Sequence, residues 1–326
     1  MVVKHSRRRF LHLAGLTAAL PAWSRIARAQ AYPSRPVRLV VNLAPGGGLD
    51  FMSRVVGEYL SRALGQQVVI ENKPGAGGML GVETVAKSPP DGYTLLATTD
   101  VVTSAPHVVS FNVDYVREIV PVIELIHFPQ VLAVHPSLGV KSIAELIAAA
   151  KKKPGMGYAT SGAGTPQHFI GEWFAQIAGI KLEHVPYRGA GQAINDLIAG
   201  HVLIACLGPT AVIPHHKAGT VRILAQSTEA RSPSLPDVPT FEEAGVKGLV
   251  LDVWQGIFAP PGIPASIVNR LNSEMNKALL DKAVRERLLE AAQEPVGGPP
   301  DHLVKILQED SAKYARLARE LKIKAE

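Results

Sequence analysis

The chain has 326 residues, of which 47% are hydrophobic and 19% charged, an ordinary globular composition with enough residues for two cores. Its formal net charge of +6 comes from residues 1–30, which carry six of the 34 lysines and arginines and no acidic residue. The other 28 basic residues equal the 28 acidic ones in number, so the rest of the chain is formally neutral. This neutrality argues against a nucleic-acid-binding protein that follows phosphates.

Residues 1–29 have the pattern of an export signal. They begin with basic residues, continue with an apolar stretch at residues 11–20 that is too short to span a bilayer comfortably, and end in "ARA". This ending predicts cleavage after Ala29 and a periplasmic mature protein. The run "SRRRFL" at residues 6–11 is similar to a twin-arginine signal, with a general secretory signal as the alternative. No later stretch is long and apolar enough to predict a membrane span.

Strand-like and helix-like segments alternate from about residue 37 to 96. The apolar run "VRLVVNL" is typical of a buried parallel strand, and the glycine loop "APGGGLD" follows it. The next segment, "FMSRVVGEYLSRAL", places apolar residues on one face of a helix that Gly65 should end. A second strand, glycine loop and helix and a third strand are predicted in "QVVIE", "NKPGAGG", "MLGVETVAK" and "SPPDGYTLLAT".

A unit with the same order recurs from about residue 156 to 208. Its strands, glycine loops and helices are predicted in "MGYATS", "GAGTPQ", "HFIGEWFAQIA", "KLEHVPY", "RGAGQ", "AINDLIAG" and "HVLIACLG". The alternation predicts two α/β domains of parallel strands with right-handed crossovers, each with its glycine loops at the carboxyl ends of its strands. Cys206, the only cysteine, lies in the last apolar strand, which predicts a buried, inert thiol rather than a nucleophile.

The segments outside these units give weaker signals. Ser142 with Glu145, and Thr240 with Glu243, have the spacing of capping boxes. The chain after Pro264 is mostly helical and amphipathic in pattern. Because no low-complexity linker occurs, extended crossing strands are expected to join the two domains.

Cofactor and metal signatures are absent from the glycine loops and histidines. Dinucleotide binding needs a third glycine, but Phe51 and Gln167 occupy that position in the two loops, and no P-loop occurs. No H-E-x-x-H motif occurs, and the adjacent pair His215 and His216 is poorly spaced for one metal and is predicted in a solvated loop. We therefore expect no cofactor and no metal.

Hydrolytic chemistry has one candidate pair. No G-x-S-x-G elbow occurs, and Ser161 with His168 is the nearest serine–histidine pair to a glycine loop. No acidic residue is placed to orient the imidazole. The alternative interpretation is that Ser161 lies in the loop and His168 in the first turn of the following helix.

Anion capture by backbone groups is the remaining chemistry. Helix N-termini carry unpaired N–H groups and partial positive charge, and glycine lets a ligand approach the backbone closely. In "SGAGTPQH", Thr165 suits the N-cap and Pro166 the first helical position. "PGGGLD" makes a similar helix start, with Asp50 as a capping acid. Each loop alone could be a tight turn, but two such loops on facing domains predict a ligand between them.

Several motifs in order resemble one family. They span residues 32–264 and read "YPSRPVRLVVNLAPGGGLD", "VVIENKPGAGGMLG", "PDGYTLL", "ATSGAGTPQHF", "VPYRGAGQAINDLIAGHV", "LPDVPTFEEAG" and "GIFAPPGIP". The chain thereby resembles the extracytoplasmic solute receptors of tripartite tricarboxylate transporters, the Bug family. The resemblance implies an α/β, two-domain periplasmic-binding-protein fold of type II, with the ligand cleft between the domains.

The resemblance also implies boundaries, function and partners. The first domain would be discontinuous, with residues 30–130 and 253–326, and residues 131–252 would form the second. A monomer would capture a small organic carboxylate through backbone groups and ordered water, without catalysis, and deliver it to membrane permease subunits. A sensory module for a membrane kinase is one alternative, and a secreted hydrolase or lyase is another.

Carried over from the family, the ligand site draws on both glycine-loop units. The implied residues are Pro45, Gly46, Gly47, Gly48, Ala76, Gly77, Gly78, Ser161, Gly162, Gly164, Thr165, His168, Tyr187, Arg188 and Gly189. Asp196 is a further motif position, with helix packing as its alternative role. The sequence "GAGQ" at residues 189–192 lacks the family's usual proline, and "TTDVVTSAP" also departs from the pattern. The ligand of better-known relatives therefore does not transfer.

Overall fold

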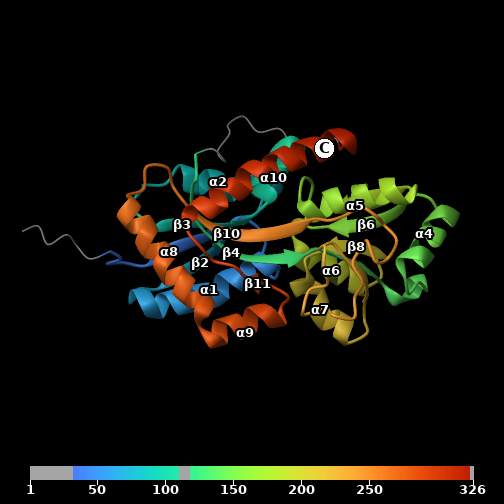
Figure 1. The fold of residues 1–326 in the computed structure, drawn as a ribbon, viewed down its shortest axis with the longest axis horizontal. Helices are drawn as coiled ribbons and strands as arrows, with labels where there is room; N and C mark the ends of the chain where they lie inside the picture. The colour runs from blue at the N-terminus through green and yellow to red at the C-terminus, as the bar shows by residue number, and fades with distance from the viewer. Residues whose placement is uncertain (1–31, 110–117, 324–326) are drawn as a thin grey trace, which may run out of the picture.

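A computed structural model describes residues 32–109 and 118–323, so the predicted export signal lies outside the described residues. Two mixed sheets organise the fold, each covered by helices (Figure 1). We call the six-stranded sheet with its helices the first lobe and the five-stranded sheet with its helices the second lobe. The α/β class predicted from the sequence is confirmed.

The first lobe is built on the strand order β11-β4-β10-β3-β1-β2. Strands β2, β1 and β3 run parallel, whereas β10 is antiparallel to both of its neighbours, β3 and β4. The strand bounds are β1 Val37–Val41, β2 Val68–Asn72, β3 Thr94–Thr99, β4 Val120–Pro129, β10 Asp252–Ala259 and β11 Glu294–Pro295.

Helices from both ends of the chain cover the first sheet. The N-terminal ones are α1 Gly48–Leu64, α2 Met79–Ala86 and the short α3 Val101–Ser104, and the C-terminal ones are α8 Ala265–Leu280, α9 Lys282–Glu290 and α10 Pro300–Glu320. Helix α1 buries the apolar face that its sequence predicts, including Met52, Val56 and Leu60. Gly65 ends it in the left-handed conformation, as predicted (φ 68°).

The second lobe repeats this topology. Its order is β7-β6-β8-β5-β9, in which β7, β6 and β8 are parallel and β5 is antiparallel to β8 and β9. The strands are β5 Val131–Val134, β6 Met156–Thr160, β7 Leu182–Pro186, β8 Ile204–Leu207 and β9 Arg222–Gln226; the helices are α4 Ile143–Lys152, α5 Pro166–Ala178, α6 Ala190–Ile198 and α7 Pro209–Lys217. The repeated unit seen in the sequence is therefore a repeated fold.

Two segments cross between the lobes, and the one from β4 to β5 is extended, as predicted. Only Gln130 separates β4 from β5, and the second crossing runs from β9 to β10. Ser227 joins the two: its N–H donates to the Gln130 carbonyl at 2.9 Å, and its hydroxyl accepts from the Gln130 N–H at 2.9 Å. The same hydroxyl donates to the Leu251 carbonyl at 2.5 Å. The crossing strands are thus tied together at one narrow point, which is the geometry of a hinge.

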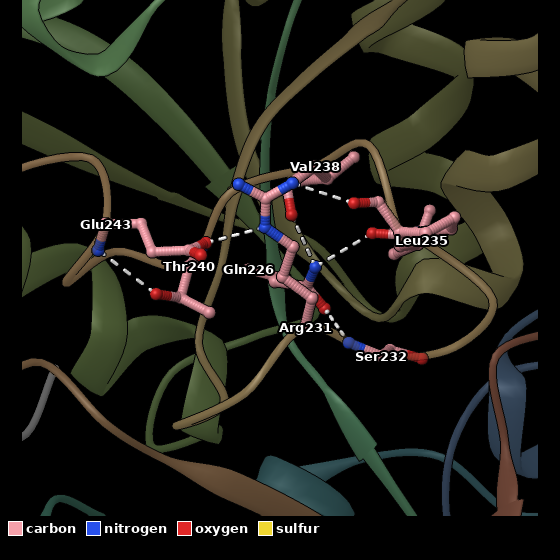
Figure 2. A network of polar contacts seen from close by, with 8 residues as sticks. Gln226, Arg231, Ser232, Leu235, Val238, Thr240 and Glu243 are labelled. Carbon is pink, nitrogen blue, oxygen red and sulfur yellow. Dashed lines mark hydrogen bonds and ion pairs between the residues drawn. The ribbon is translucent and has the colours of Figure 1, made fainter.

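The side chain of Gln226 organises the start of the second crossing segment (Figure 2). Its Nε2 donates to the carbonyls of Leu235 and Val238 at 3.1 and 2.7 Å, and its Oε1 accepts from the Ser232 N–H at 2.8 Å. The Thr240–Glu243 capping box forms reciprocally, at 3.1 and 2.7 Å. It caps only a series of turns that ends at Gly245, in a left-handed conformation, so no α-helix follows this box.

The remaining sequence predictions have mixed outcomes. The Ser142 hydroxyl caps α4 by accepting from the Glu145 N–H at 3.2 Å, as predicted. Cys206 is fully buried, which raises the pKa of its thiol well above the usual range, so it is inert as predicted. The solvated loop predicted for His215 and His216 is wrong, because both lie in the last turn of α7.

Two properties of the described part of the chain bear on function. No helix within residues 32–109 and 118–323 combines the length and apolar character needed to cross a membrane. In the same ranges, no three His, Cys, Asp or Glu side chains gather so as to hold a metal ion.

Candidate functional site

A small cavity lies between the two lobes, at the carboxyl ends of β1, β3, β6 and β8. Its volume is about 40 Å³, enough for a few water-sized groups. From the first lobe it is lined by Leu43, Ala44, Gly47, Gly48, Leu49, Thr99, Val101, Phe128, Val253 and Gln255. From the second lobe it is lined by Ser161, Thr165, Pro166, Gln167, Ala190 and Gly208. The carboxyl ends of α/β strands are the usual place for a ligand, and none of these lining side chains carries a formal charge.

Four helices begin at this cavity. The N-caps of α1, α5, α6 and α7 are Gly47, Thr165, Gly189 and Gly208. None of the four N-cap side chains makes a capping hydrogen bond. No capping side chain therefore takes up the first-turn N–H groups, and four positive helix ends converge on an uncharged lining. Such a site favours an anion.

Asp50 positions the first glycine loop from within α1. Its Oδ2 accepts from the Gly46 N–H at 3.2 Å, and its carboxylate also binds Arg54 at 2.9 and 3.1 Å. Burial alone would raise the pKa of Asp50, but the hydrogen bonds from Arg54, Gly46 and Asn72 outweigh it and lower the pKa. Asp50 thus stays ionised, and its carboxylate holds the Gly46 N–H of the loop rather than contacting the ligand.

The second glycine loop precedes α5. Thr165 and Pro166 take the N-cap and first helical positions, as predicted. The Thr165 hydroxyl does not cap the helix, however, because it donates to the Gly162 carbonyl at 2.7 Å. It closes the loop on itself and leaves the N-terminus of α5 open.

His168 is part of the support for this loop. Its Nδ1 accepts from the Gly164 N–H at 3.2 Å, and its ring stacks on His184 with centroids 3.7 Å apart. The imidazole nitrogen nearest the loop is therefore occupied by a backbone donor. This arrangement does not make His168 a base for Ser161, and the hydrolase alternative gains no support.

Burial and the neighbouring His184 lower the pKa of His168 to about 3. The ring is thus neutral in the folded protein, and the stability this gives is complete above the ordinary histidine pKa of about 6.5 and lost as the pH falls towards 3. The wild type should lose unfolding free energy between pH 8 and pH 5, partly because His168 must stay neutral in the folded state. His168→Asn keeps an acceptor near Nδ1 but cannot titrate, so we expect its loss over the same pH range to be smaller by about 2 kcal/mol. Urea unfolding at both pH values measures this.

The matched control for this prediction is His201→Asn. The side chain of His201 is 73% exposed, so its variant controls for the replacement of a surface histidine by asparagine. If the unfolding free energies of His168→Asn and the wild type fall equally between pH 8 and pH 5, His168 is protonated as readily in the folded protein as in the unfolded chain.

The lobes touch each other around the cavity. The Ser104 hydroxyl of the first lobe donates to the Gly164 carbonyl of the second at 2.7 Å. A Cβ added to Gly189 would lie 2.8 Å from the Ala44 Cβ, and one added to Gly191 would lie 3.1 Å from the Pro45 carbonyl oxygen. The glycines therefore permit a backbone-to-backbone approach, and the structure is a closed one.

The structure distributes the sequence-predicted site residues over several roles. Gly47, Gly48, Ser161 and Thr165 line the cavity. Outside its lining, Pro45 and Gly46 face Gly191 at the lobe contact, and Gly189 faces Ala44. Gly162, Gly164 and His168 hold the second loop together.

The other predicted residues serve packing or lie at the surface. Ala76, Gly77 and Gly78 form a short 3-10 turn, in which a Cβ at Gly78 would lie 2.7 Å from the Asn42 side chain. The Tyr187 hydroxyl donates to Asp196 at 2.6 Å, which gives Asp196 the packing role left open above. Arg188 is exposed.

The sequence analysis did not predict the cavity-lining residues that the crossing strands contribute. Phe128 lies in β4, and Val253 and Gln255 lie in β10. It also missed Gly208, which precedes a helix with proline at its first position, Pro209. That proline is a signal of a helix start, and it could have directed attention to a fourth N-terminus.

Two α/β lobes of like topology, joined by crossing strands and closed over a small cavity, define a solute-binding protein of the periplasmic type. Solved structures agree. The periplasmic binding protein BugD is 30% identical, with a TM-score of 0.86 over 90% of this chain and all of that one. R. palustris Rpa4515 with adipate is 33% identical, with a TM-score of 0.88 over 90% of this chain and all of that one. MatC from Rhodopseudomonas palustris with bound malate is 28% identical, with a TM-score of 0.81 over 88% and 99%.

Sequence comparison identifies the family. Residues 52–323 match the tripartite tricarboxylate transporter family receptor. Protein BugT of Bordetella pertussis is 34% identical over 319 residues, covering 96% of this chain and 97% of BugT. A protein encoded between tcbD and tcbE in Pseudomonas sp. strain P51 is 37% identical over 96% of this chain and 94% of its own. The chain belongs to the tripartite tricarboxylate transporter receptor family, a family of solute-binding receptors and not of enzymes.

Proposed function

We propose that this receptor captures a small organic carboxylate between its lobes. The observation that carries the proposal is the convergence of four uncapped helix N-termini on one cavity whose lining has no charged side chain. Backbone N–H groups and helix dipoles suit a carboxylate, and the lining has no carboxylate that would suit a cation. The adipate and malate named with two related structures support this class of ligand.

The family and the start of the sequence support a proposal for the cellular role. We propose export through a twin-arginine-like signal, cleavage after Ala29, and a periplasmic monomer that delivers its ligand to the permease subunits of a tripartite transporter. We further propose residues 30–130 with 253–326 as one domain and residues 131–252 as the other. We also propose that the sequence-predicted site residues outside the cavity lining belong to the ligand-binding region.

A thermal-shift screen tests the ligand class. The receptor is unfolded in guanidinium, dialysed to remove carried-over ligand, refolded, and screened against aliphatic and aromatic mono- and dicarboxylates. A bound carboxylate at a hundredfold excess over its Kd should stabilise the protein by about 2.7 kcal/mol. Sugars and metal cations form the comparison set, and stabilisation by them but by no carboxylate would overturn the proposal.

A further inference from the structure

A chain of hydrogen bonds crosses from one lobe to the other beside the cavity. The side chain of Gln293, just before β11 in the first lobe, is fully buried. Its Nε2 donates to the Gly48 carbonyl at 2.8 Å and to the Thr210 hydroxyl at 3.1 Å. Thr210 belongs to α7 of the second lobe, and its hydroxyl donates in turn to the Ala291 carbonyl of the first lobe at 3.1 Å. We call this chain of four residues the Thr210 relay.

The chemistry of the groups fixes the direction of each hydrogen bond in the Thr210 relay. A carbonyl only accepts, so the two hydrogens of the Gln293 Nε2 serve Gly48 and Thr210. The single hydroxyl hydrogen of Thr210 goes to Ala291, the C-cap of α9, where a helix leaves carbonyls without an intrahelical partner. Without the Thr210 hydroxyl, one Gln293 hydrogen and the Ala291 carbonyl both lose their partner.

The Thr210 relay acts on a peptide group in the first turn of α1. The Gly48 carbonyl and the Leu49 N–H belong to one planar trans peptide, in which the two groups point in opposite directions. Gly48 and Leu49 both line the cavity, and no side chain caps the N–H groups at this helix end. The hydrogen bond from Gln293 to the carbonyl therefore fixes the direction of the Leu49 N–H.

The Thr210 relay requires the lobes to be together at this point. Gly48 lines the cavity from the first lobe and Gly208 from the second, and Thr210 is two residues beyond Gly208 in the first turn of α7. A solute enters a site between two lobes when the lobes part. That separation takes Thr210 away from Gln293 and Ala291, which both remain with the first lobe. Gln293 then keeps Gly48 as a partner but loses Thr210.

We propose that Gln293 is a positioning residue for the N-terminus of α1 and that Thr210 couples it to closure of the second lobe. The inference rests on the carboxylate function proposed above, because the N–H groups that the relay orients are those suited to an anion. It adds which residues connect the α1 N-terminus to the other lobe. Since such coupling is reciprocal, a solute held at the α1 N-terminus stabilises the relay, and the relay stabilises the bound solute.

Thr210→Val tests the coupling, because it removes the hydroxyl group at almost the same side-chain volume. The refolded, ligand-free receptor is titrated with succinate, malate, adipate and benzoate in a calorimeter. For each of these acids that the wild type binds, the Kd of Thr210→Val should be about tenfold higher, since two hydrogen bonds of the closed state are lost. The urea midpoint of the ligand-free variant should stay near that of the wild type, because the open receptor lacks the relay.

Three further variants complete the experiment. Thr84→Val is the matched control: the Thr84 hydroxyl donates within α2 to the Leu80 carbonyl at 2.8 Å, away from the second lobe, so its loss should leave each Kd unchanged. Thr210→Ser keeps the hydroxyl and should bring each Kd to within about threefold of the wild type. Thr210→Ala removes the same hydroxyl and repeats the test if the valine variant does not refold.

The Kd separates coupling from a merely structural contact. A contact present in both the open and the closed receptor would lower the ligand-free urea midpoint and leave each Kd as it is. Equal Kd values for Thr210→Val and Thr84→Val therefore overturn the inference, and so does a Thr210→Ser variant that binds as weakly as Thr210→Val. Both results leave the carboxylate function standing. A wild-type receptor that binds none of the four acids defeats the carboxylate function and the inference together.

Discussion

Gly164→Val is expected to weaken ligand binding by about tenfold to a hundredfold while the protein still folds. Gly164 belongs to the second lobe, has a left-handed φ of 73°, and a Cβ added there would lie 3.0 Å from the Ala105 Cα of the first lobe. Its carbonyl accepts the Ser104 hydrogen bond that joins the lobes. Overpacking of such a contact costs about 1–3 kcal/mol. Since the contact exists only when the lobes close, that cost falls on the closed state, and the apparent Kd rises accordingly.

Gly179→Val is the matched control for this prediction. Gly179 ends the same helix, α5, has a similar φ of 61°, and a Cβ added there meets nothing within 4 Å. Both variants carry the strain of a valine in the left-handed region, so both should lose unfolding free energy. Only the Gly164 variant should lose affinity in calorimetry with the carboxylate found by the thermal-shift screen. Equal affinities for the two variants would show that binding does not require this lobe contact.

The repeated α/β unit was predictable because its signals are local. Apolar runs, glycine loops and amphipathic helices lie next to one another in the chain, and the topology β2-β1-β3 recurs as β7-β6-β8. The helix ends at Gly65 and Gly179 were also predictable from the sequence, because a left-handed residue after a helix is usually glycine. The position of the cleft follows from the same patterns, because both sets of loops leave the carboxyl ends of their strands.

The composition of the cavity was not predictable in the same way. Strand β10 comes from a distant part of the chain and inserts between β3 and β4, so no local pattern places Gln255 beside Gly48. Glycine patterns also do not separate ligand contact from packing. Gly78 and Gly81 are required by the close Asn42 side chain, where added Cβ atoms would lie 2.7 and 2.6 Å from its atoms. A glycine loop that resembles a ligand loop can therefore serve the core of its own lobe.

Helix α10 adds a connection that the sequence did not indicate. It packs on β4 and α3 of the first lobe and reaches α5 of the second (Figure 1). The ring of Tyr314 makes an edge contact with Phe169 of α5, with centroids 4.9 Å apart, while its hydroxyl donates to Asp100. Asp100 is fully buried and lies between Thr99 and Val101, which line the cavity. Tyr314 thus contacts both lobes, next to the segment that carries Thr99 and Val101 of the cavity lining.

Tyr314→Phe isolates the hydrogen bond of this link, because the ring contact with Phe169 is retained. Burial, reinforced by the Asp310 carboxylate, raises the pKa of Asp100 well above its usual range, and the Tyr314 hydrogen bond acts against that rise. The Asp100 Oδ1 already has no partner among the described residues. Without the tyrosine hydroxyl, the buried carboxyl group of Asp100 loses the donor to its Oδ2 and retains only the weaker hydrogen bond from the Thr99 side chain. We therefore expect a loss of about 1–3 kcal/mol in unfolding free energy.

Urea unfolding of the wild type, Tyr314→Phe and Tyr187→Phe measures this loss. Tyr187 makes the same kind of hydrogen bond to Asp196, but near the surface, where water can replace the lost hydroxyl, so its variant should lose much less. An unchanged m-value ensures that the midpoints report stability rather than a change in the unfolded state. If the two variants lose the same amount, the burial of Asp100 does not set the strength of its hydrogen bond.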